Sequence, residues 1–144
     1  MYWLRHLLSL SILPFLISCI PGSVLLTEDN CFSLVEDAEY TLVFNSEADR
    51  EVFPGHLNAF DVSLERVNQD VAVNQEPFAL TAMPSSSYID VNLRSQTIRV
   101  DGEPVRVHLM TDSSARPRQY YVTFQAMQGE RIVPACLVVT VKAD

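Results

Sequence analysis

The sequence predicts an all-β protein, an antiparallel β-sandwich of about seven to nine strands behind a short apolar N-terminal segment. From residue 40 onward, apolar and polar residues alternate with a period of two, which is typical of half-buried strands. Turn-forming residues separate these runs, and helical periodicity is not sustained anywhere after the N-terminal segment. Several short strands in a chain of 144 residues favour two packed sheets in one domain, with a small β-barrel as the alternative.

The expected strands follow one another along the chain, and each is identified by apolar residues at alternate positions. The run at 60–65 alternates most regularly, since its polar residues occupy 61, 63 and 65. In chain order, the apolar residues that define the strands are Tyr40, Leu42 and Phe44; Phe60, Val62 and Leu64; Phe78, Leu80 and Ala82; Ile89, Val91 and Leu93; Ile98 and Val100; Val105, Val107 and Leu109; Tyr120, Val122, Phe124 and Ala126; and Leu137, Val139 and Val141.

Turn signals separate these strands. Asp101-Gly102 lies between the runs at 98–100 and 105–109 and predicts a hairpin with a type I′ turn, since both central residues of that turn need positive φ. Gln128-Gly129 predicts a second hairpin between the last two strands. The prolines at 54, 77, 84, 104, 117 and 134 lie at or near expected strand ends, where a missing N–H is tolerated. The segment Ser46–Glu51 has a capping pattern and is a candidate for a single helical turn.

The C-terminal residues 119–144, QYYVTFQAMQGERIVPACLVVTVKAD, form the longest stretch of alternating apolar residues. This stretch resembles the final F–G hairpin of bacterial immunoglobulin-like (Ig-like) domains. The resemblance implies an Ig-like β-sandwich as the fold. It carries no functional residue, so it implies nothing about activity.

The N-terminal segment predicts an export signal. Arg5 precedes an apolar run from Leu7 to Ile17, and this run is shorter than the about 20 residues that a membrane-spanning helix needs. A buried N-terminal strand or helix is the alternative. Ordinary signal cleavage requires small residues one and three positions before the cut, and cuts after Cys19, Gly22 or Ser23 do not meet this requirement.

The residues Leu16-Ile17-Ser18-Cys19 resemble the lipobox of bacterial lipoproteins. The resemblance implies that the Cys19 thiol carries a diacylglycerol, that cleavage occurs just before it, and that two or three acyl chains anchor the protein stably. Ile20 follows the cysteine, which by the same resemblance favours the outer membrane in a Gram-negative cell. The chain is thus expected to divide into a signal peptide (1–18), a lipidated tether (19–30) and one β-sandwich domain (31–144), periplasmic or facing the cell surface.

Lipidation of Cys19 would leave Cys31 and Cys136 as an even pair in an exported protein, and a disulfide between them is the simplest interpretation. Two free buried thiols are the alternative. Strict alternation places Cys136 on the opposite face from Leu137 and Val139, so the bridge should reach the outer face or an edge of its sheet. A bulge near Pro134 would reverse that expectation.

The charge balance is acidic, with 18 Asp and Glu against 10 Lys and Arg and a net charge of −8. Nucleic acid is therefore not an expected partner, because its binding depends on basic residues that neutralise phosphates. The early acidic residues are interpreted as a solvated face, and a Ca²⁺ site is the alternative, since Ca²⁺ needs six to eight oxygen ligands. These residues are Glu28, Asp29, Glu36, Asp37, Glu39, Glu47, Asp49 and Glu51.

The sequence does not indicate an enzyme, and no cofactor or small-molecule substrate is expected. The histidines His6, His56 and His108 are far apart in the sequence, and the chain has no closely spaced His or Cys pair of the kind that begins a zinc site. The serine clusters near 86 and 113 lack the glycines of a nucleophile elbow, and no base is paired with them in the sequence.

An excess of arginine between Arg94 and Arg131 is the best candidate for a binding surface. Arginine and tyrosine are enriched at protein interfaces, and Arg116-Pro117-Arg118 precedes a Tyr-Tyr pair. Arginines scattered over a sheet surface are the alternative interpretation. The candidate partner-binding residues are Arg99, Arg106, Arg116, Arg118 and Tyr121.

These observations together favour a non-catalytic envelope lipoprotein that binds a protein partner as an accessory or assembly subunit of an envelope or surface structure. A surface adhesin or carbohydrate-binding module is one alternative, and it depends on Tyr121 as an outward-facing aromatic residue. A small hydrolase inhibitor is another, with Met110–Gln119 as its inhibitory loop.

Overall fold

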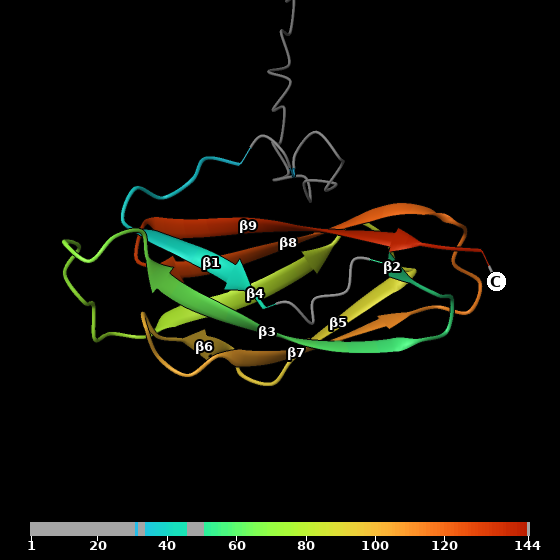
Figure 1. Cartoon of the computed structure of the whole chain (residues 1–144), viewed down its shortest axis with the longest axis horizontal. Coiled ribbons are helices and arrows are strands. Elements are labelled where there is room, and N and C mark those ends of the chain that lie inside the picture. Colours follow the sequence, from blue (N-terminus) through green and yellow to red (C-terminus); the bar gives the residue numbers. More distant parts are fainter. Residues whose placement is uncertain (1–30, 32–33, 46–50, 144) are drawn as a thin grey trace, which may run out of the picture.

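The computed structural model describes residues 31, 34–45 and 51–143, and the structural statements below concern these residues. They form nine strands (Figure 1). The strands are β1 (Tyr40–Phe44), β2 (Glu51–Val52), β3 (Leu57–Arg66), β4 (Phe78–Pro84), β5 (Ile89–Leu93), β6 (Thr97–Ile98), β7 (Val105–Thr111), β8 (Arg118–Gln128) and β9 (Arg131–Val141).

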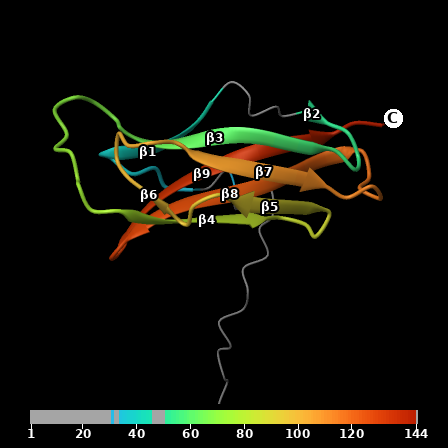
Figure 2. The ribbon, with the colours of Figure 1, turned by 90° about the horizontal axis from the view of Figure 1, so that it is seen from below.

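The strands form two sheets that pack face to face, so the predicted β-sandwich is confirmed and the barrel alternative is wrong. The first sheet has the order β1-β3-β7-β5 and the second has the order β2-β9-β8-β4-β6. All strand pairs are antiparallel except β2–β9, and Figure 2 shows the strands of both layers running along the long axis. With β1, β3, β7 and β5 as strands A, B, E and D, and β4, β8 and β9 as C, F and G, this order is that of an Ig-like sandwich.

The core lies between the sheets and consists of the alternate residues that the sequence pattern selects. Phe60, Val62 and Leu64 of β3 face Val122 and Phe124 of β8, and all five side chains are buried. The rings of Phe124 and Phe60 meet edge to face with centroids 6.2 Å apart. Each fully buried aliphatic or aromatic side chain of this kind contributes about 1.5–3 kcal/mol to folding.

The hairpin predicted around Asp101-Gly102 is wrong. β6 pairs with β4 in the second sheet and β7 pairs with β3 and β5 in the first, so the turn carries the chain from one sheet to the other. Asp101 has φ 52°, whereas Gly102 does not have a positive φ, so the turn is not type I′. The Asp101 carboxylate pairs with Arg66 Nε at 2.6 Å, and its N–H donates to Leu64 O at 2.8 Å. The Asp-Gly signal therefore predicted a turn correctly but not the strands that flank it.

The second predicted hairpin is confirmed. β8 and β9 pair over their whole length, from Arg118↔Val141 to Gln128↔Arg131. Gly129 has φ 59° at the first central position of the turn, as a type II′ turn requires.

Cys31 and Cys136 form the predicted disulfide, with their Cα atoms 5.5 Å apart and a sequence separation of 105. The alternation along β9 is unbroken at Pro134, since Val133, Leu137 and Val139 are all buried. Cys136 therefore points to the outer face of the second sheet, as predicted. The bridge ties the N-terminal part of the domain to that face.

Pro84 is the last residue of β4, as expected, whereas Pro134 lies inside β9 and not near a strand end; neither position loses a ladder hydrogen bond. Lys142 N–H donates to Val52 O at 2.9 Å, so the even-numbered residues of β9 direct their backbone groups away from β8. Ser85 N–H donates to Tyr121 O at 2.7 Å, so the odd-numbered residues of β4 face β8 and the even-numbered ones face away. Pro134 and Pro84 thus both lack their N–H on the side of the strand that faces away from β8, where proline is tolerated.

The predicted signal peptide, Cys19 with its tether, and most of the predicted helical turn at Ser46–Glu51 lie outside the described residues. Their assignments remain predictions. Within the described part of the chain, no helix has the length and apolar character that crossing a membrane requires.

Candidate partner-binding surface

The four arginines that the sequence nominated lie at opposite ends of the sandwich. Arg99 donates to Gln75 O, and the side chain of Gln128, the last residue of β8, donates to Glu76 O at 3.3 Å. Arg118 is the first residue of the same 11-residue strand. At about 3.3 Å per residue, Arg118 lies roughly 33 Å from the end of the sandwich where Arg99 lies. The candidate residues therefore do not form one surface.

Tyr121 lies on the outer face of the second sheet, as its alternation with Tyr120 and Val122 predicts, but it is only 7% exposed. Its hydroxyl donates to Gln119 Oε1 at 3.3 Å, and its N–H donates to Ser85 Oγ at 3.0 Å. The exposed aromatic platform on which the carbohydrate-binding alternative depended is therefore not present at this residue.

Arg116 belongs to the exposed loop between β7 and β8, and Arg118 begins β8 directly after this loop. The Arg118 guanidinium lies over the Tyr120 ring, 4.7 Å from its centroid, and Tyr120 Oη donates to Arg116 O at 3.1 Å. The loop is further held by Asp112, whose carboxylate accepts hydrogen bonds from the hydroxyl and the N–H of Ser114. These two hydrogen bonds lower the pKa of Asp112 below its usual range, and the bond from the Ser114 hydroxyl has the larger effect. Ala115, within the same loop, is buried, so this segment is anchored at several points.

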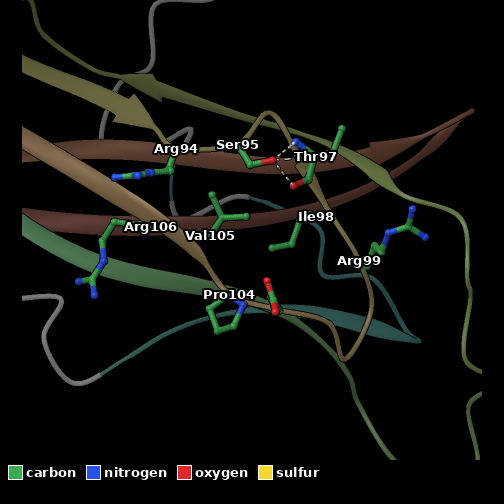
Figure 3. Close-up of a pocket in the computed structure, with 9 residues that line it drawn as sticks. Arg94, Ser95, Thr97, Ile98, Arg99, Pro104, Val105 and Arg106 are labelled. Carbon is green, nitrogen blue, oxygen red and sulfur yellow. Dashed lines mark hydrogen bonds between the residues drawn. The ribbon is translucent and has the colours of Figure 1, made fainter.

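Arg99 and Arg106 line a hollow of about 630 Å³, which we call the arginine hollow (Figure 3). It lies where the chain crosses from β5 to β6 and back to β7. Its lining residues are Arg94, Ser95, Thr97, Ile98, Arg99, Glu103, Pro104, Val105 and Arg106.

Arg94 was part of the arginine excess in the sequence but was not among the candidate site residues. Its N–H donates to Arg106 O at 2.9 Å, which continues the β5–β7 ladder and sets the two arginines side by side. Figure 3 shows their side chains extending to the same side of the hollow, whereas Arg99 extends to the other side. The register between β5 and β7 creates this pair, and no local sequence signal reveals it.

The three arginines differ in how far their charges are engaged. Arg106 Nε pairs with Asp61 Oδ1 at 3.0 Å, and Arg99 donates to the Gln75 carbonyl. Arg94 is exposed, and no side chain of the described residues pairs with its guanidinium. Glu103 is the acidic residue among those lining the hollow. The hollow is therefore basic in an acidic protein, and its arginines suit carboxylates, which a guanidinium binds with two parallel hydrogen bonds.

The acidic residues that suggested a Ca²⁺ site are partly described. Arg131 pairs with Glu39 at 2.6 Å and with Asp37 at 3.5 Å, and Glu51 pairs with Lys142 at 2.6 Å. The hydrogen bond to Glu39 is the main cause that raises the pKa of Arg131. Glu28, Asp29, Glu47 and Asp49 lie outside the described residues. Among the residues that are described, no three or more His, Cys, Asp or Glu side chains come together as a metal site would need.

A scan against models of known protein families finds no match, and a search of curated proteins finds none either.

Proposed function

We propose that this protein is a non-catalytic envelope lipoprotein that docks an acidic protein partner, as an accessory or assembly subunit of an envelope or surface structure. The observation that supports docking of an acidic partner is the arginine hollow, a basic surface on a chain with a net charge of −8. The motif Leu16-Ile17-Ser18-Cys19 supports membrane anchoring through a lipid on Cys19.

The anchor and the domain are joined at a defined point. Acylated Cys19 precedes Cys31 by twelve residues, which reach at most about 43 Å when fully extended. The disulfide holds Cys31 on the outer face of the second sheet, so the tether would enter the domain there. Cys31 would then remain within roughly 43 Å of the membrane surface, so the domain would meet its partner close to the membrane.

The arginines would act chiefly by steering and orienting the partner. Exposed charges of one sign accelerate association with an oppositely charged surface and are screened by salt. Arg94 and Arg106 present two neighbouring guanidinium groups, so an acidic residue or loop of the partner would meet both at once. Neutral or basic partners would gain nothing from this surface, which gives it selectivity.

The membrane half is tested by the intact mass of the protein extracted from membranes, beside a Cys19→Ala variant. The expected mass is that of residues 19–144 plus acyl groups, with the variant uncut. A soluble, unacylated product cut at another position would disprove the lipoprotein assignment.

The docking half is tested by cross-linking in intact cells that express the full chain. An Arg94→Glu/Arg106→Glu variant should lose its specific cross-linked product, and 0.5 M salt should weaken the wild-type complex. An Arg116→Glu/Arg118→Glu variant carries the same charge change at the other end of the sandwich and should keep the product. Loss of the product in the second variant but not in the first would contradict the proposed surface.

One observation favours a second candidate, the small hydrolase inhibitor. The loop between β7 and β8 is exposed at Arg116 and anchored by Asp112, Ala115 and Tyr120, which is the rigidity that an inhibitory loop needs. A panel of envelope and host hydrolases, assayed with wild-type protein and with Arg116→Ala, tests it. Inhibition that the substitution removes would support this function, and a panel without inhibition would reject it for those enzymes.

A further inference from the structure

β5 is an edge strand whose outer backbone groups have no partner among the described residues. Arg94 N–H donates to Arg106 O, and Asp112 N–H donates to Tyr88 O, so the even-numbered residues of this strand bond to β7. The odd-numbered residues therefore direct their backbone groups outward. The outward groups are the N–H of Val91 and Leu93 and the C=O of Ile89, Val91 and Leu93.

A groove runs beside this edge. It has a volume of about 440 Å³ and lies between β5 of the first sheet and β4 of the second. Leu80 is fully buried at its base, and Ala82, Val91 and Leu93 pack partly against the core. Its lining residues are Ala79, Leu80, Thr81, Ala82, Val91, Asn92, Leu93 and Gln96. A strand added to β5 would direct every second side chain toward this groove, where Ala82, Val91 and Leu93 supply apolar contacts and Thr81, Asn92 and Gln96 supply polar ones.

The β5 edge lacks the outward-facing proline that β4 and β9 have. Free strand edges invite pairing with other chains, and proteins commonly block them with proline or by covering them. Pro84 in β4 and Pro134 in β9 occupy such blocking positions, as described above. β5 contains no proline and no lysine in its sequence IDVNL. This edge therefore combines unpaired backbone groups with an open groove whose lining is partly polar and partly apolar.

The arginine hollow begins where β5 ends. Arg94 follows Leu93 directly, and the hydrogen bond to Arg106 O holds it at the end of the free edge. An extended segment along β5 would therefore bring its terminal residue to two arginines. That geometry specifies both the shape of a ligand and its charge.

We propose that the free edge of β5 is a strand-addition site, which takes an extended segment of the partner with alternating apolar residues and an acidic residue beside Arg94 and Arg106. This inference rests on the proposed docking function and specifies how docking occurs. Backbone hydrogen bonds would supply sequence-independent affinity, whereas the groove and the arginines would supply selectivity. The occupant is a polypeptide, since only a backbone offers donors and acceptors at the spacing of a strand.

The test uses a labelled heptapeptide, acetyl-Glu-Val-Thr-Val-Thr-Val-Glu-amide, titrated into the full chain by fluorescence anisotropy. A matched peptide with lysine in place of both glutamates should bind at least about tenfold more weakly. A third peptide with N-methylated valines cannot form the strand ladder and should not bind. Amide hydrogen exchange should slow at Val91 and Leu93 when the acidic peptide is present. Protection at another strand instead would overturn the proposal.

Val91→Pro removes an outward N–H without breaking the β5–β7 ladder, as Pro84 and Pro134 already do in their strands. It should weaken peptide binding about five- to tenfold, whereas Val91→Thr, which keeps the N–H, should leave the affinity nearly unchanged. Unchanged amide protection at Asn92 would show that the ladder is intact. Equal affinity of both variants would overturn the proposal, and the N-methylated peptide decides the matter if Val91→Pro does not fold.

Two further outcomes separate this inference from the function on which it rests. If Arg94→Glu/Arg106→Glu abolishes cross-linking in cells but Val91→Pro does not, the docking function stands and strand addition is wrong. If neither variant affects cross-linking, both proposals fail. Protection of Val91 and Leu93 that depends on protein concentration without peptide would identify a second copy of this chain as the occupant and would also overturn the proposal.

Discussion

Breaking the Cys31–Cys136 bridge should be the most destabilising single change that leaves the core side chains in place. The bridge closes a loop with a sequence separation of 105, which is nearly the whole domain. It joins β9 to the N-terminal end of the domain, so its loss frees a long part of the unfolded chain. The perturbation is reduction of the wild-type protein, compared with a Cys31→Ala/Cys136→Ala variant.

The expected magnitude follows from the loop length. In the chain-entropy description, the loss of unfolded-state entropy grows with the logarithm of the loop, and a loop of about 100 residues corresponds to about 4.7 kcal/mol at 25 °C. This value is an upper limit, because residual structure in the unfolded chain reduces it. Small domains have a total stability of about 5–15 kcal/mol, so the bridge would provide a large part of it.

Equilibrium urea unfolding measures this effect. The transition is followed by far-UV circular dichroism, with and without a thiol reductant. At a slope of about 1–3 kcal/mol per molar urea, a loss near 4 kcal/mol moves the midpoint by roughly 1.3–4 M. The double alanine variant should unfold at the same urea midpoint as the reduced wild type. This agreement would show that the shift comes from loss of the disulfide and not from a direct effect of the reductant. A shift below about 0.5 M in both would refute the loop-closure reasoning.

Three further outcomes are expected. Phe124→Ala should lower the free energy of unfolding by about 3–5 kcal/mol in urea unfolding, because the ring is fully buried in the core. Gly129→Ala should cost about 1 kcal/mol in the same assay, since φ is 59° there, whereas Gly129→Asn should cost less. The pKa of Asp112 is lowered from its ordinary 3.8, so the stabilisation of its turn is present above that pH and is lost as pH falls through the lowered value. The hydrogen-exchange protection factor of Ser114 should therefore fall in acid, and Asp112→Asn should abolish this dependence.

Much of the fold could be predicted from the sequence because burial imposes a period of two on each strand. The apolar residues nominated in β3, β7, β8 and β9 are buried in the structure. The outward direction of Cys136 was predicted by the same rule, since Val133 to Val141 alternate without a bulge. These features depend on neighbours one or two positions away, and such information is present in the local sequence.

The features that the sequence did not predict depend on which strands become neighbours. Asp101-Gly102 favours a turn wherever it occurs, and the destination of the next strand is set by the packing of both sheets. Arg94 and Arg106 are 12 positions apart and meet only through the β5–β7 register, with Arg94 N–H donating to Arg106 O at 2.9 Å. Arg118, which seemed an equivalent candidate, lies at the far end of β8. Pairwise register is a tertiary property, so the site could not be assembled from spacing alone.

The attachment point and the proposed docking edge lie on different sides of the sandwich, and this arrangement bears on how the protein would work. Cys136 belongs to β9, whereas the β5 edge lies beside β4, and β8 separates β9 from β4 in the second sheet. At about 4.8 Å per strand, β9 and β4 are roughly 10 Å apart within that sheet, and β5 lies across the core from them. A tether that entered the domain at Cys31, as the proposed anchor requires, would enter on a different side from the β5 edge. If both proposals hold, a partner strand could add to β5 while the domain stays at the membrane, because anchoring and docking would use different surfaces.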